Sequence, residues 1–595
     1  MLLKHLHQRK KTFCRNLTGG QIIYNKLVEK NVKDVFMYTG GAIMPLIDAF
    51  FESKKINYFI NTHEQSGGHA ATGYAKVTGK PGISIVTSGP GLTNSVTPLT
   101  DANNDGIPLI VFSGQVSLAT MGTQAFQECP SVDITKPITK WSYCVQNVSE
   151  LPEVIDEAFK VATNGKPGSV HIDLPKCITS EKFIPKKNKK IGFGNTFTKE
   201  KKINLQQIKN IADLINNSKK PVLLLGQGCN NASTALRKFA IKANIPVTTT
   251  IHAMGCFDEL EDLSLEMLGM HGNVSANYAI QDSDLIIALG TRFDDRITGK
   301  IKHFAPNAHR AFKDGTGGII HVNINNIEIN KVLNTNFNFH ATCLDFLETI
   351  QPFITYNSRN DWLNKISNWQ IKNPFDYKKL SINIKTQDVI CQINKYLLDK
   401  NIKDYAISTG VGNHQMMAAQ FIKWRYPYSM LTSGSLGTMG VGLPYAIGCQ
   451  IAYPDKLVID IDGDGSFNHT LSELKTIKNY ELPVKIAIIN DCQLSMVTAW
   501  EKLFFQERYT ATDLYENPDY ELLAKSYGIK AITCKNQYEL KEKVEYFLNY
   551  KGPIVCNFLV KSDLCLPLVP PNSALDDMIL SDNKKKINTT DLPPG

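Results

Sequence analysis

Short runs of apolar residues recur along the chain, and each run ends at a polar or glycine-rich turn. Amphipathic segments lie between these runs. Continuous apolar strands that alternate with helices are typical of parallel sheets covered by helices on both faces. The pattern therefore predicts an α/β fold of doubly wound parallel sheets, with strands at 83–86, 108–112, 170–173, 221–225, 285–289, 457–461 and 484–489.

Two polar segments interrupt this pattern. Residues 176–204 are basic and lack apolar periodicity, and residues 354–382 are polar, with Pro374 and asparagine-rich turns. A tail at 561–595 is rich in proline and lysine, which predicts an extended or partly disordered end. We interpret the two polar segments as linkers between three domains of α/β size, at 17–178, 205–350 and 382–560.

Composition narrows the class of protein. Hydrophobic residues make up 43% and charged residues 20% of the 595 residues, which is ordinary for a globular chain. The net charge of +9 gathers in a few lysine-rich runs, which indicates solvated faces rather than a nucleic-acid surface. No apolar stretch approaches the roughly 18 residues of a membrane span. The 13 cysteines form no metal-like pairs, which favours a reducing compartment.

The first 16 residues carry several basic side chains and no acid. This composition is typical of an organelle transit segment, although the stretch is short and poor in serine. We therefore expect an organelle location, with a cytoplasmic protein and a plain basic terminus as the alternative.

The run 457–461 leads into Gly463, Asp464 and Gly465. Glycines let a ligand approach the backbone, and the carboxyl end of a parallel strand is where α/β sheets bind ligands. A second apolar run ends at Asn490 and Asp491. Carboxylates at the ends of neighbouring strands can hold an octahedral Mg²⁺ together with diphosphate oxygens. For the glycine turn taken alone, a simple tight turn is the alternative.

Two further features belong to the same hypothesis. Ser466 opens a predicted helix whose N–H groups can bind phosphate. Glu64 follows the apolar end of a predicted strand and precedes a helix of small residues at 67–74, a position where a carboxylate can be desolvated. A surface or helix-capping glutamate is the alternative interpretation of Glu64.

These motifs together resemble the thiamine-diphosphate enzymes. From Leu17 to about residue 577, nearly every segment is similar to the catalytic subunits of acetolactate synthase. The segments LGMHG at 268–272, RFDDR at 292–296 and MVTAW at 496–500 are specific to that branch. An insertion, GTGGIIH at 315–321, resembles the fungal mitochondrial type. The resemblance implies a pyrimidine-binding, a central FAD-binding and a diphosphate-binding domain.

The resemblance assigns roles at the reaction centre. Glu64 would hold the pyrimidine ring of the coenzyme in its active tautomer. Gly437 would bind that ring through its carbonyl, and Met439 would keep the coenzyme bent. Arg296 and Trp500 would receive the second keto acid, although Arg296 could instead pair with Asp294 or Asp295, and Trp500 could be core. The reaction site would also be lined by Phe126 and Gln127.

The remaining positions come from the same resemblance. The family usually has asparagine where this chain has Asp491, which adds a negative charge beside the diphosphate. The metal ligands would be Asp464, Asp491 and the backbone carbonyl of Gln493. The coenzyme would also contact Gly40, Gly41, Gly412, Asn413, His414, Gly463, Gly465, Ser466 and Met496.

The central domain, by resemblance, binds FAD, which is largely structural in this family because the net reaction is not redox. The chain departs from relatives at Asn323 and Asn325, where they carry aspartates, and at Ser435, where they carry glycine. The candidate flavin contacts are Gly226, Gly228, Met270, His271, Gly290, Arg292, Asp295 and Asn323.

The expected function follows from these assignments. The chain would decarboxylate pyruvate and join the remaining two-carbon unit to pyruvate or 2-oxobutyrate, the first common step towards branched-chain amino acids. The expected assembly is a homodimer or tetramer with a separate regulatory small subunit. The alternatives are another enzyme of the fold, such as pyruvate oxidase or glyoxylate carboligase, and a non-catalytic homologue that acts as a binding subunit.

Overall fold

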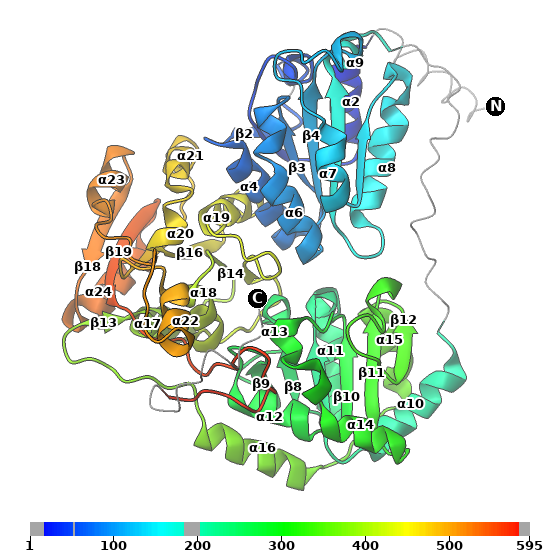
Figure 1. The fold of residues 1–595 in the computed structure, drawn as a ribbon, viewed down its shortest axis with the longest axis vertical. Coiled ribbons are helices and arrows are strands. Elements are labelled where there is room, and N and C mark those ends of the chain that lie inside the picture. Colours follow the sequence, from blue (N-terminus) through cyan, green and yellow to red (C-terminus); the bar gives the residue numbers. More distant parts are fainter. Residues whose placement is uncertain (1–16, 52–53, 184–202, 582–595) are drawn as a thin grey trace.

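The computed structural model describes residues 17–51, 54–183 and 203–581. Three sheets, each flanked by helices, form three domains (Figure 1), and every strand pair within them is parallel. The predicted fold class is therefore confirmed. The expected transit segment at 1–16 lies outside the described residues. Among the residues that the structure describes, no helix combines the length and apolarity of a bilayer span.

The N-terminal domain is a six-stranded sheet in the order β2-β1-β3-β4-β6-β5. Its central strands are buried along their whole length, as expected for a sheet covered on both faces. The strands are β1 (Asp34–Met37), β2 (Asn57–Ile60), β3 (Gly82–Val86), β4 (Leu109–Gln115), β5 (Trp141–Cys144) and β6 (Ser169–Pro175). The helices are α2 (Gly19–Glu29), α3 (Met44–Asp48), α4 (Glu64–Thr78), α5 (Pro90–Thr93), α6 (Val96–Asp105), α7 (Ser131–Thr135), α8 (Leu151–Thr163) and α9 (Lys176–Ser180).

The central domain is a second six-stranded sheet, in the order β12-β11-β10-β7-β8-β9. Its strands are β7 (Pro221–Leu225), β8 (Val247–Thr249), β9 (Ser264–Met267), β10 (Leu285–Leu289), β11 (Gly318–Asn323) and β12 (Phe337–His340). Its helices are α10 (Leu205–Asn217), α11 (Ser233–Ala243), α12 (Val274–Asp282), α13 (Asp295–Thr298), α14 (Pro306–Lys313) and α15 (Cys343–Ile350).

The C-terminal domain has seven strands, in the order β13-β19-β17-β16-β14-β15, with β18 beside β19. The strands are β13 (Ile384–Lys385), β14 (Tyr405–Thr409), β15 (Met430–Leu431), β16 (Leu457–Gly463), β17 (Lys485–Asn490), β18 (Lys530–Cys534) and β19 (Ile554–Lys561). The helices are α17 (Thr386–Asp399), α18 (Asn413–Phe421), α19 (Gly442–Ala452), α20 (Asp464–Phe467), α21 (Leu474–Asn479), α22 (Ser495–Phe504), α23 (Tyr520–Ser526) and α24 (Gln537–Asn549).

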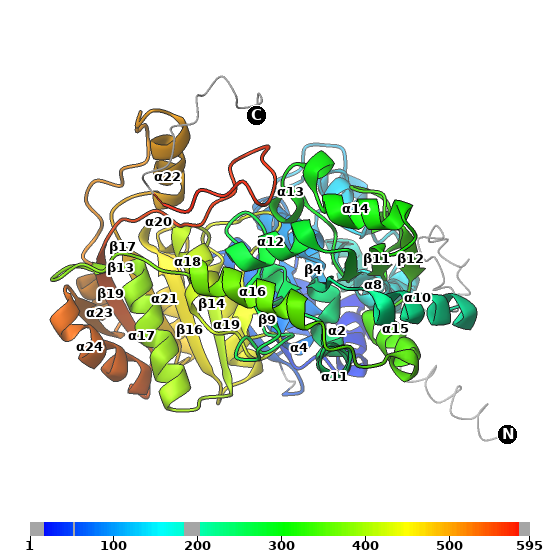
Figure 2. The ribbon, with the colours of Figure 1, turned by 90° about the horizontal axis from the view of Figure 1, so that it is seen from below.

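The segment 354–382 is not a plain linker. It contains helix α16 (Asn360–Lys372), which lies on the outer side of the central domain (Figure 2). Trp362 and Ile366 are buried against the core of that domain, and Trp369 packs beside them. Their spacing of four and then three residues places them on one helix face, an amphipathic signal that the polar composition of the segment obscured.

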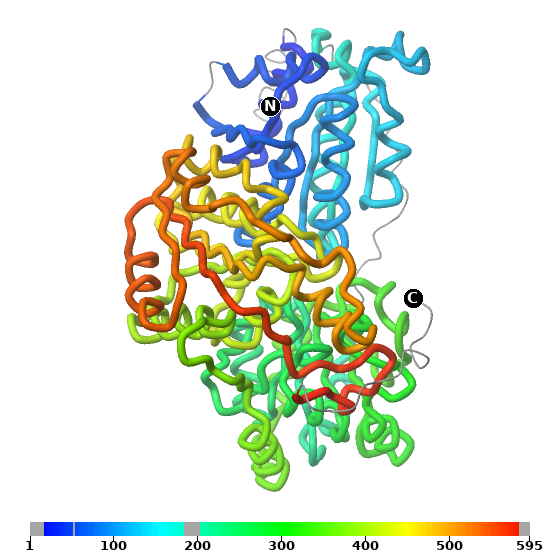
Figure 3. The backbone as a smooth tube through the Cα atoms, turned by 60° about the vertical axis from the view of Figure 1, so that its left-hand side comes forward, coloured from blue at the N-terminus to red at the C-terminus, as the bar shows by residue number. Residues whose placement is uncertain are grey.

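The described part of the tail packs against the rest of the molecule. Residues 562–581 contain no helix or strand, yet they run across to the central domain (Figure 3). The N–H of Val569 donates to the carbonyl oxygen of Met270 at 2.8 Å. Val569 and Leu575 are buried in the core of the central domain. Apolar side chains at these two positions anchor the described part of the tail, despite its many prolines.

The N-terminal and C-terminal domains share one apolar core. Helices α4 and α19 pack against each other, and residues of both join a single hydrophobic cluster. A Cβ added at Gly73 would lie 2.6 Å from the backbone of Tyr445, and one added at Gly448 would lie 1.9 Å from the carbonyl oxygen of Ala70. These glycines let the helix backbones touch, which fixes how the two domains sit within one chain.

Candidate active site

The predicted metal site lies at the carboxyl edge of the C-terminal sheet. Strands β16 and β17 are neighbours, with Gly463 opposite Ile489. Asp464 directly follows β16 and is buried. Its Oδ1 accepts the backbone N–H of Gly465 at 2.8 Å, and its Oδ2 accepts the N–H of Cys492 and the side-chain amide of Asn517, both at 2.7 Å. Burial, followed by the nearby Asp491 carboxylate, raises the pKa of Asp464 to about 6.

Asp491 lies one residue beyond the end of β17. Its carboxylate accepts the backbone N–H of Gln493 at 3.2 Å and the hydroxyl of Ser495. Burial raises its pKa. Within the described ranges, no group of three or more His, Cys, Asp or Glu side chains could hold a metal. A cation here would therefore rely on the two carboxylates, a backbone carbonyl and oxygens from outside the chain, as Mg²⁺ commonly does.

Two backbone turns surround these carboxylates. A Cβ at Gly463 would lie 2.6 Å from Nδ1 of His414, so only glycine lets β16 approach the start of α18 this closely. Asn413 donates to the carbonyl oxygen of Asp563 at 3.2 Å, while its own side-chain oxygen has no partner. Ser466 accepts the N–H of Gly440 at 2.8 Å. These turns, from Gly412 to His414 and from Gly463 to Ser466, form a polar pocket edge that suits a diphosphate.

The residues expected at the ring end of the coenzyme fall into two groups. One group lies on residues 433–439, which we call the ring-end turn. Gly437 adopts a φ of +72° there, a conformation that favours glycine. Gly437, Met439, Met496 and Trp500 line one cavity with Arg296. Arg296 is also 3.7 Å from Asp295, and Trp500 packs edge-on against Phe504, so both simpler interpretations describe real contacts.

The second group lies on the N-terminal domain. Glu64 is in the first turn of α4, where it accepts a hydrogen bond from Asn94 at 3.0 Å. Phe126 is 89% exposed, and the neighbouring Gln127 has a φ of +61°. A Cβ at Gly41 would meet nothing within 4 Å, whereas one at Gly40 would lie 2.5 Å from Thr87. The predicted residues Glu64, Phe126, Gln127, Gly40 and Gly41 do not line the cavity of the ring-end turn in this chain.

The same cavity extends into the central domain and has a volume of about 860 Å³. A Cβ at Gly226 would lie 2.1 Å from the carbonyl oxygen of Gly290, so these loops touch through their backbones. Asp294 lines the cavity, whereas the side chain of Asp295 is 81% exposed and does not. Of the eight predicted flavin contacts, the following seven line it: Gly226, Gly228, Met270, His271, Gly290, Arg292 and Asn323.

Two departures from the family take defined roles in this cavity. Asn323 donates to the carbonyl oxygen of Thr291 at 2.8 Å and accepts the N–H of Asn325 at 2.9 Å, so it closes its own loop. Ser435 accepts a hydrogen bond from Arg292 at 2.8 Å. A glycine at position 435 could not make this bond, which ties the central domain to the ring-end turn.

Comparison with known proteins gives the family. Models of the thiamine pyrophosphate enzymes match residues 17–135 (N-terminal TPP binding domain), 208–350 (central domain) and 410–558 (C-terminal TPP binding domain). The mitochondrial acetolactate synthase catalytic subunit of Saccharomyces cerevisiae is 44% identical over 97% of this chain and 85% of its own length. The chain belongs to the acetolactate synthase family.

Other relatives agree with this membership. The mitochondrial acetolactate synthase of Schizosaccharomyces pombe is 43% identical over 95% of this chain and 87% of its own length. The chloroplastic acetolactate synthase 1 of Nicotiana tabacum is 39% identical over 94% of this chain and 84% of its own length. The family recognition made from the motifs is therefore confirmed.

The residues present fit the family's cofactors. The buried Asp464 carboxylate, the half-buried Asp491 carboxylate and an oxygen-rich edge suit Mg²⁺ and a diphosphate. The large cavity, crossed by backbone-exposing glycines, suits FAD. Sequence reasoning missed Asn517, which lies beside Asp464, and the buried acids Asp101 and Asp105 of α6. The only available signal for the two acids was their spacing of four residues, which places them on one helix face.

Proposed function

We propose that the chain is the catalytic subunit of an acetolactate synthase. It would decarboxylate pyruvate and join the two-carbon remainder to pyruvate or 2-oxobutyrate, at the start of branched-chain amino-acid synthesis. The observation that carries this proposal is one cavity lined by Gly437, Met439, Arg296 and Trp500. The Asp464 carboxylate lies at the nearby sheet edge, where a Cβ added at the adjacent Gly465 would lie 3.6 Å from Met439. Its fungal relatives are mitochondrial by name, and we place this chain in the same compartment.

The bound thiamine diphosphate supplies an electron sink at its thiazolium carbon. Asp464 and Asp491 would hold its diphosphate through Mg²⁺, with Gln493 offering its carbonyl. Glu64 would hold a proton at the pyrimidine ring nitrogen, the general acid–base role that a positioned carboxylate can play. Gly437 would accept a hydrogen bond from the same ring through its carbonyl oxygen.

The acceptor keto acid needs a carboxylate ligand and a shaped wall. The Arg296 side chain is 59% exposed and faces the cavity, so its guanidinium can bind a carboxylate in a bidentate way. The Trp500 indole supplies an apolar wall that can favour one additional methylene by about 1–3 kcal/mol. These two side chains would therefore set the preference between 2-oxobutyrate and pyruvate.

A second chain is supported by Glu64 and Phe126, which do not line the cavity of the ring-end turn in their own chain, and Phe126 is exposed. In a symmetric dimer, that face of one copy can cover the cavity of the other. We therefore propose a homodimer as the least active unit, and a tetramer can repeat it. A separate regulatory subunit is part of the proposal because the relatives include chains named catalytic subunits.

A colorimetric acetolactate assay on the purified protein tests this function. Pyruvate is supplied with and without thiamine diphosphate, Mg²⁺ and FAD, and a parallel reaction contains an artificial electron acceptor. We expect acetolactate that depends on the coenzyme and metal and does not depend on the electron acceptor. No cofactor-dependent product, even with a regulatory subunit added, or pyruvate consumption that requires the electron acceptor would contradict the proposal.

A further inference from the structure

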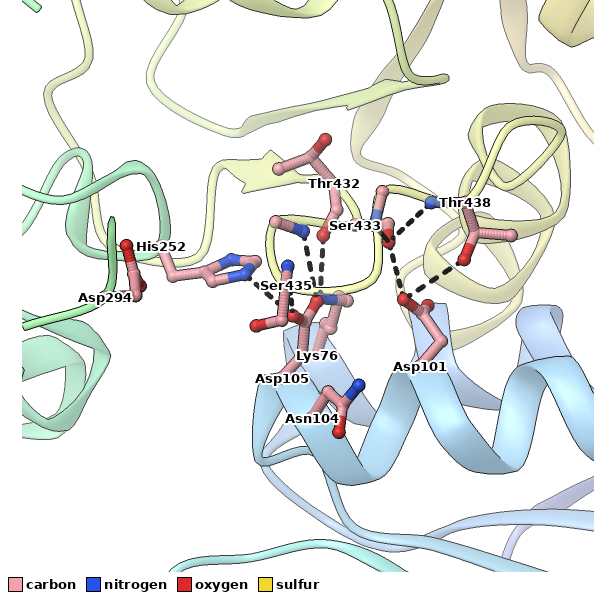
Figure 4. Close-up of polar contacts among 12 residues, drawn as sticks. Lys76, Asp101, Asn104, Asp105, His252, Asp294, Thr432, Ser433, Ser435 and Thr438 are labelled. Carbon is pink, nitrogen blue, oxygen red and sulfur yellow. Dashed lines mark hydrogen bonds and ion pairs between the residues drawn. The ribbon is translucent and has the colours of Figure 1, made fainter. Parts of the chain in front are cut away.

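Helix α6 of the N-terminal domain meets the ring-end turn of the same chain (Figure 4). Asp101 and Asp105 point from one face of this helix towards residues 432–438, and both carboxylates are buried. A buried carboxylate is costly unless it is hydrogen-bonded, so the hydrogen-bond partners of these two acids identify the residues that the contact holds in place. The two acids contact different residues of the turn.

Asp105 contacts the first residues of the ring-end turn. Its carboxylate pairs with Lys76 at 2.9 Å, lies 3.1 Å from Nε2 of His252, and accepts the backbone N–H of Ser435 at 3.0 Å. His252 belongs to the short helix η5 (Ile251–Ala253) of the central domain, so three domains meet at this carboxylate. Burial alone would raise the pKa of Asp105, but His252 and Lys76 hold it well below its ordinary value.

Asp101 contacts both ends of the turn, because it accepts hydrogen bonds from the hydroxyl of Ser433 and, at 3.5 Å, from that of Thr438. The Ser433 hydroxyl donates to Oδ1 of Asp101 at 2.5 Å and accepts the backbone N–H groups of Gly437 at 3.1 Å and Thr438 at 3.0 Å. A hydroxyl has one proton and two acceptor sites. Since the proton is committed to the carboxylate, both acceptor sites face the turn, and the direction of all three hydrogen bonds is fixed.

These hydrogen bonds hold Gly437, the residue expected to contact the coenzyme ring. Gly437 has a positive φ and its N–H bound to Ser433. The N–H of Thr438, which shares a peptide plane with the Gly437 carbonyl, is bound to the same oxygen, so the orientation of that carbonyl follows from the position of the Ser433 oxygen. A Cβ at Gly437 would meet nothing within 4 Å, so the space on that side of the residue is open. The hydrogen bonds to Ser433 are the polar contacts that hold the Gly437 and Thr438 N–H groups.

We propose that Asp101 is a positioning residue, which acts through Ser433 to aim the Gly437 carbonyl at the coenzyme ring. This inference rests on the proposed function, because it assumes that Gly437 meets the aminopyrimidine. It gives the N-terminal domain two separate tasks: α6 shapes the site of its own chain, while Glu64 on α4 serves the site of the other chain.

A simpler role for Asp101 is to fasten two domains together. The Tyr445 hydroxyl separates the two interpretations, because it donates to the other oxygen of Asp101 and makes no bond to the ring-end turn. A fastening role predicts similar effects when either donor is removed. A positioning role predicts that only the loss of the Ser433 hydroxyl disturbs the turn.

The experiment compares Ser433→Ala with the matched control Tyr445→Phe in the holoenzyme. Deuterium exchange of backbone amides in the peptides that cover 433–440 reports on the turn. Exchange of the coenzyme C2 proton, followed without pyruvate by acid quench and proton NMR, reports on coenzyme activation. Binding of thiamine diphosphate with Mg²⁺ reports on the phosphate end. Asp101→Asn, which keeps the side-chain shape, serves as a second variant if Ser433→Ala does not fold.

We expect Ser433→Ala to speed amide exchange in the turn and to slow C2 exchange by about 10- to 100-fold, the range for losing hydrogen bonds in a charge-assisted chain. Coenzyme affinity should stay within about threefold, and Tyr445→Phe should stay within about twofold in all three measurements. Equal effects of the two variants, or unchanged C2 exchange in Ser433→Ala, would overturn the inference. If the wild-type protein does not accelerate C2 exchange at all, the proposed function fails. Amide exchange in residues 433–440 would still show whether the Ser433 hydroxyl orders the ring-end turn.

Discussion

The two ends of the proposed coenzyme site are built in different ways. At the phosphate end, Asp464 and Asp491 follow neighbouring strands of one sheet, and their hydrogen-bond partners belong to the same domain. At the ring end, the turn that holds Gly437 is hydrogen-bonded to a helix of another domain, and Glu64 and Phe126 do not line the cavity of their own chain. A site that one sheet supplies is complete in one chain, whereas a site shared between domains depends on how the domains and chains assemble.

The largest effect is expected at the phosphate end, where loss of a metal ligand should abolish both cofactor binding and activity. Asp464→Asn removes a negative ligand of the metal, so coenzyme-dependent activity should fall to background, and thermal unfolding should no longer shift upwards with thiamine diphosphate and Mg²⁺. The protein without cofactors should be at least as stable at pH 7. Burial raises the pKa of this carboxyl above its unfolded value, so its charge opposes folding at neutral pH. A retained cofactor-induced shift in melting temperature would contradict the assignment.

Glu64→Gln should have the next largest effect, at the ring end. Loss of a general acid–base group lowers kcat by roughly 100- to 10,000-fold, and Gln keeps the size of the side chain. Because the phosphate end is untouched, coenzyme affinity, measured by titration of intrinsic fluorescence, should change little. A variant that binds the coenzyme poorly would show that the two ends are not separable in this way.

Asp491→Asn should have a moderate effect on the metal. It introduces the amide that the resemblance implies at this position and removes one charge from the proposed cation site. We expect Mg²⁺ affinity to fall by about 3- to 10-fold, since ligand charge tunes such sites. Activity measured against Mg²⁺ concentration checks this. Asp513→Asn is the control, because Asp513 lies across the bridge from Gln493 and is exposed. Equal shifts in both variants would indicate a general charge effect.

Ser435→Gly should have the smallest effect. It removes the hydroxyl that accepts from Arg292 but leaves the bond from Arg292 to the carbonyl oxygen of Asn104. We expect FAD to dissociate about two- to fivefold faster, consistent with the loss of one partly exposed hydrogen bond. Flavin fluorescence after dilution measures the rate, and slower release would contradict this account.

The sequence predicted the phosphate end because its signals are local. An apolar run, a glycine turn and an acid lie within a few residues of one another, and all seven predicted strands are present in the structure. Helix α16 was missed because the segment was classed as a linker from its polar composition, although Trp362, Ile366 and Trp369 have helical spacing. The bond from Ser433 to Asp101 joins positions 332 residues apart, and neither residue carries a local motif. Such contacts depend on domain packing, which periodicity does not reveal.

The account depends most on the claim that one site uses Glu64 of one copy and Asp464 of the other, and subunit mixing tests it directly. Glu64→Gln and Asp464→Asn chains, each inactive alone, are unfolded or dissociated together in equal amounts and reassembled. Random pairing makes half of the dimers mixed, and each mixed dimer holds one intact site, so about a quarter of wild-type activity should return. No activity above that of the separate variants would contradict a site shared between chains.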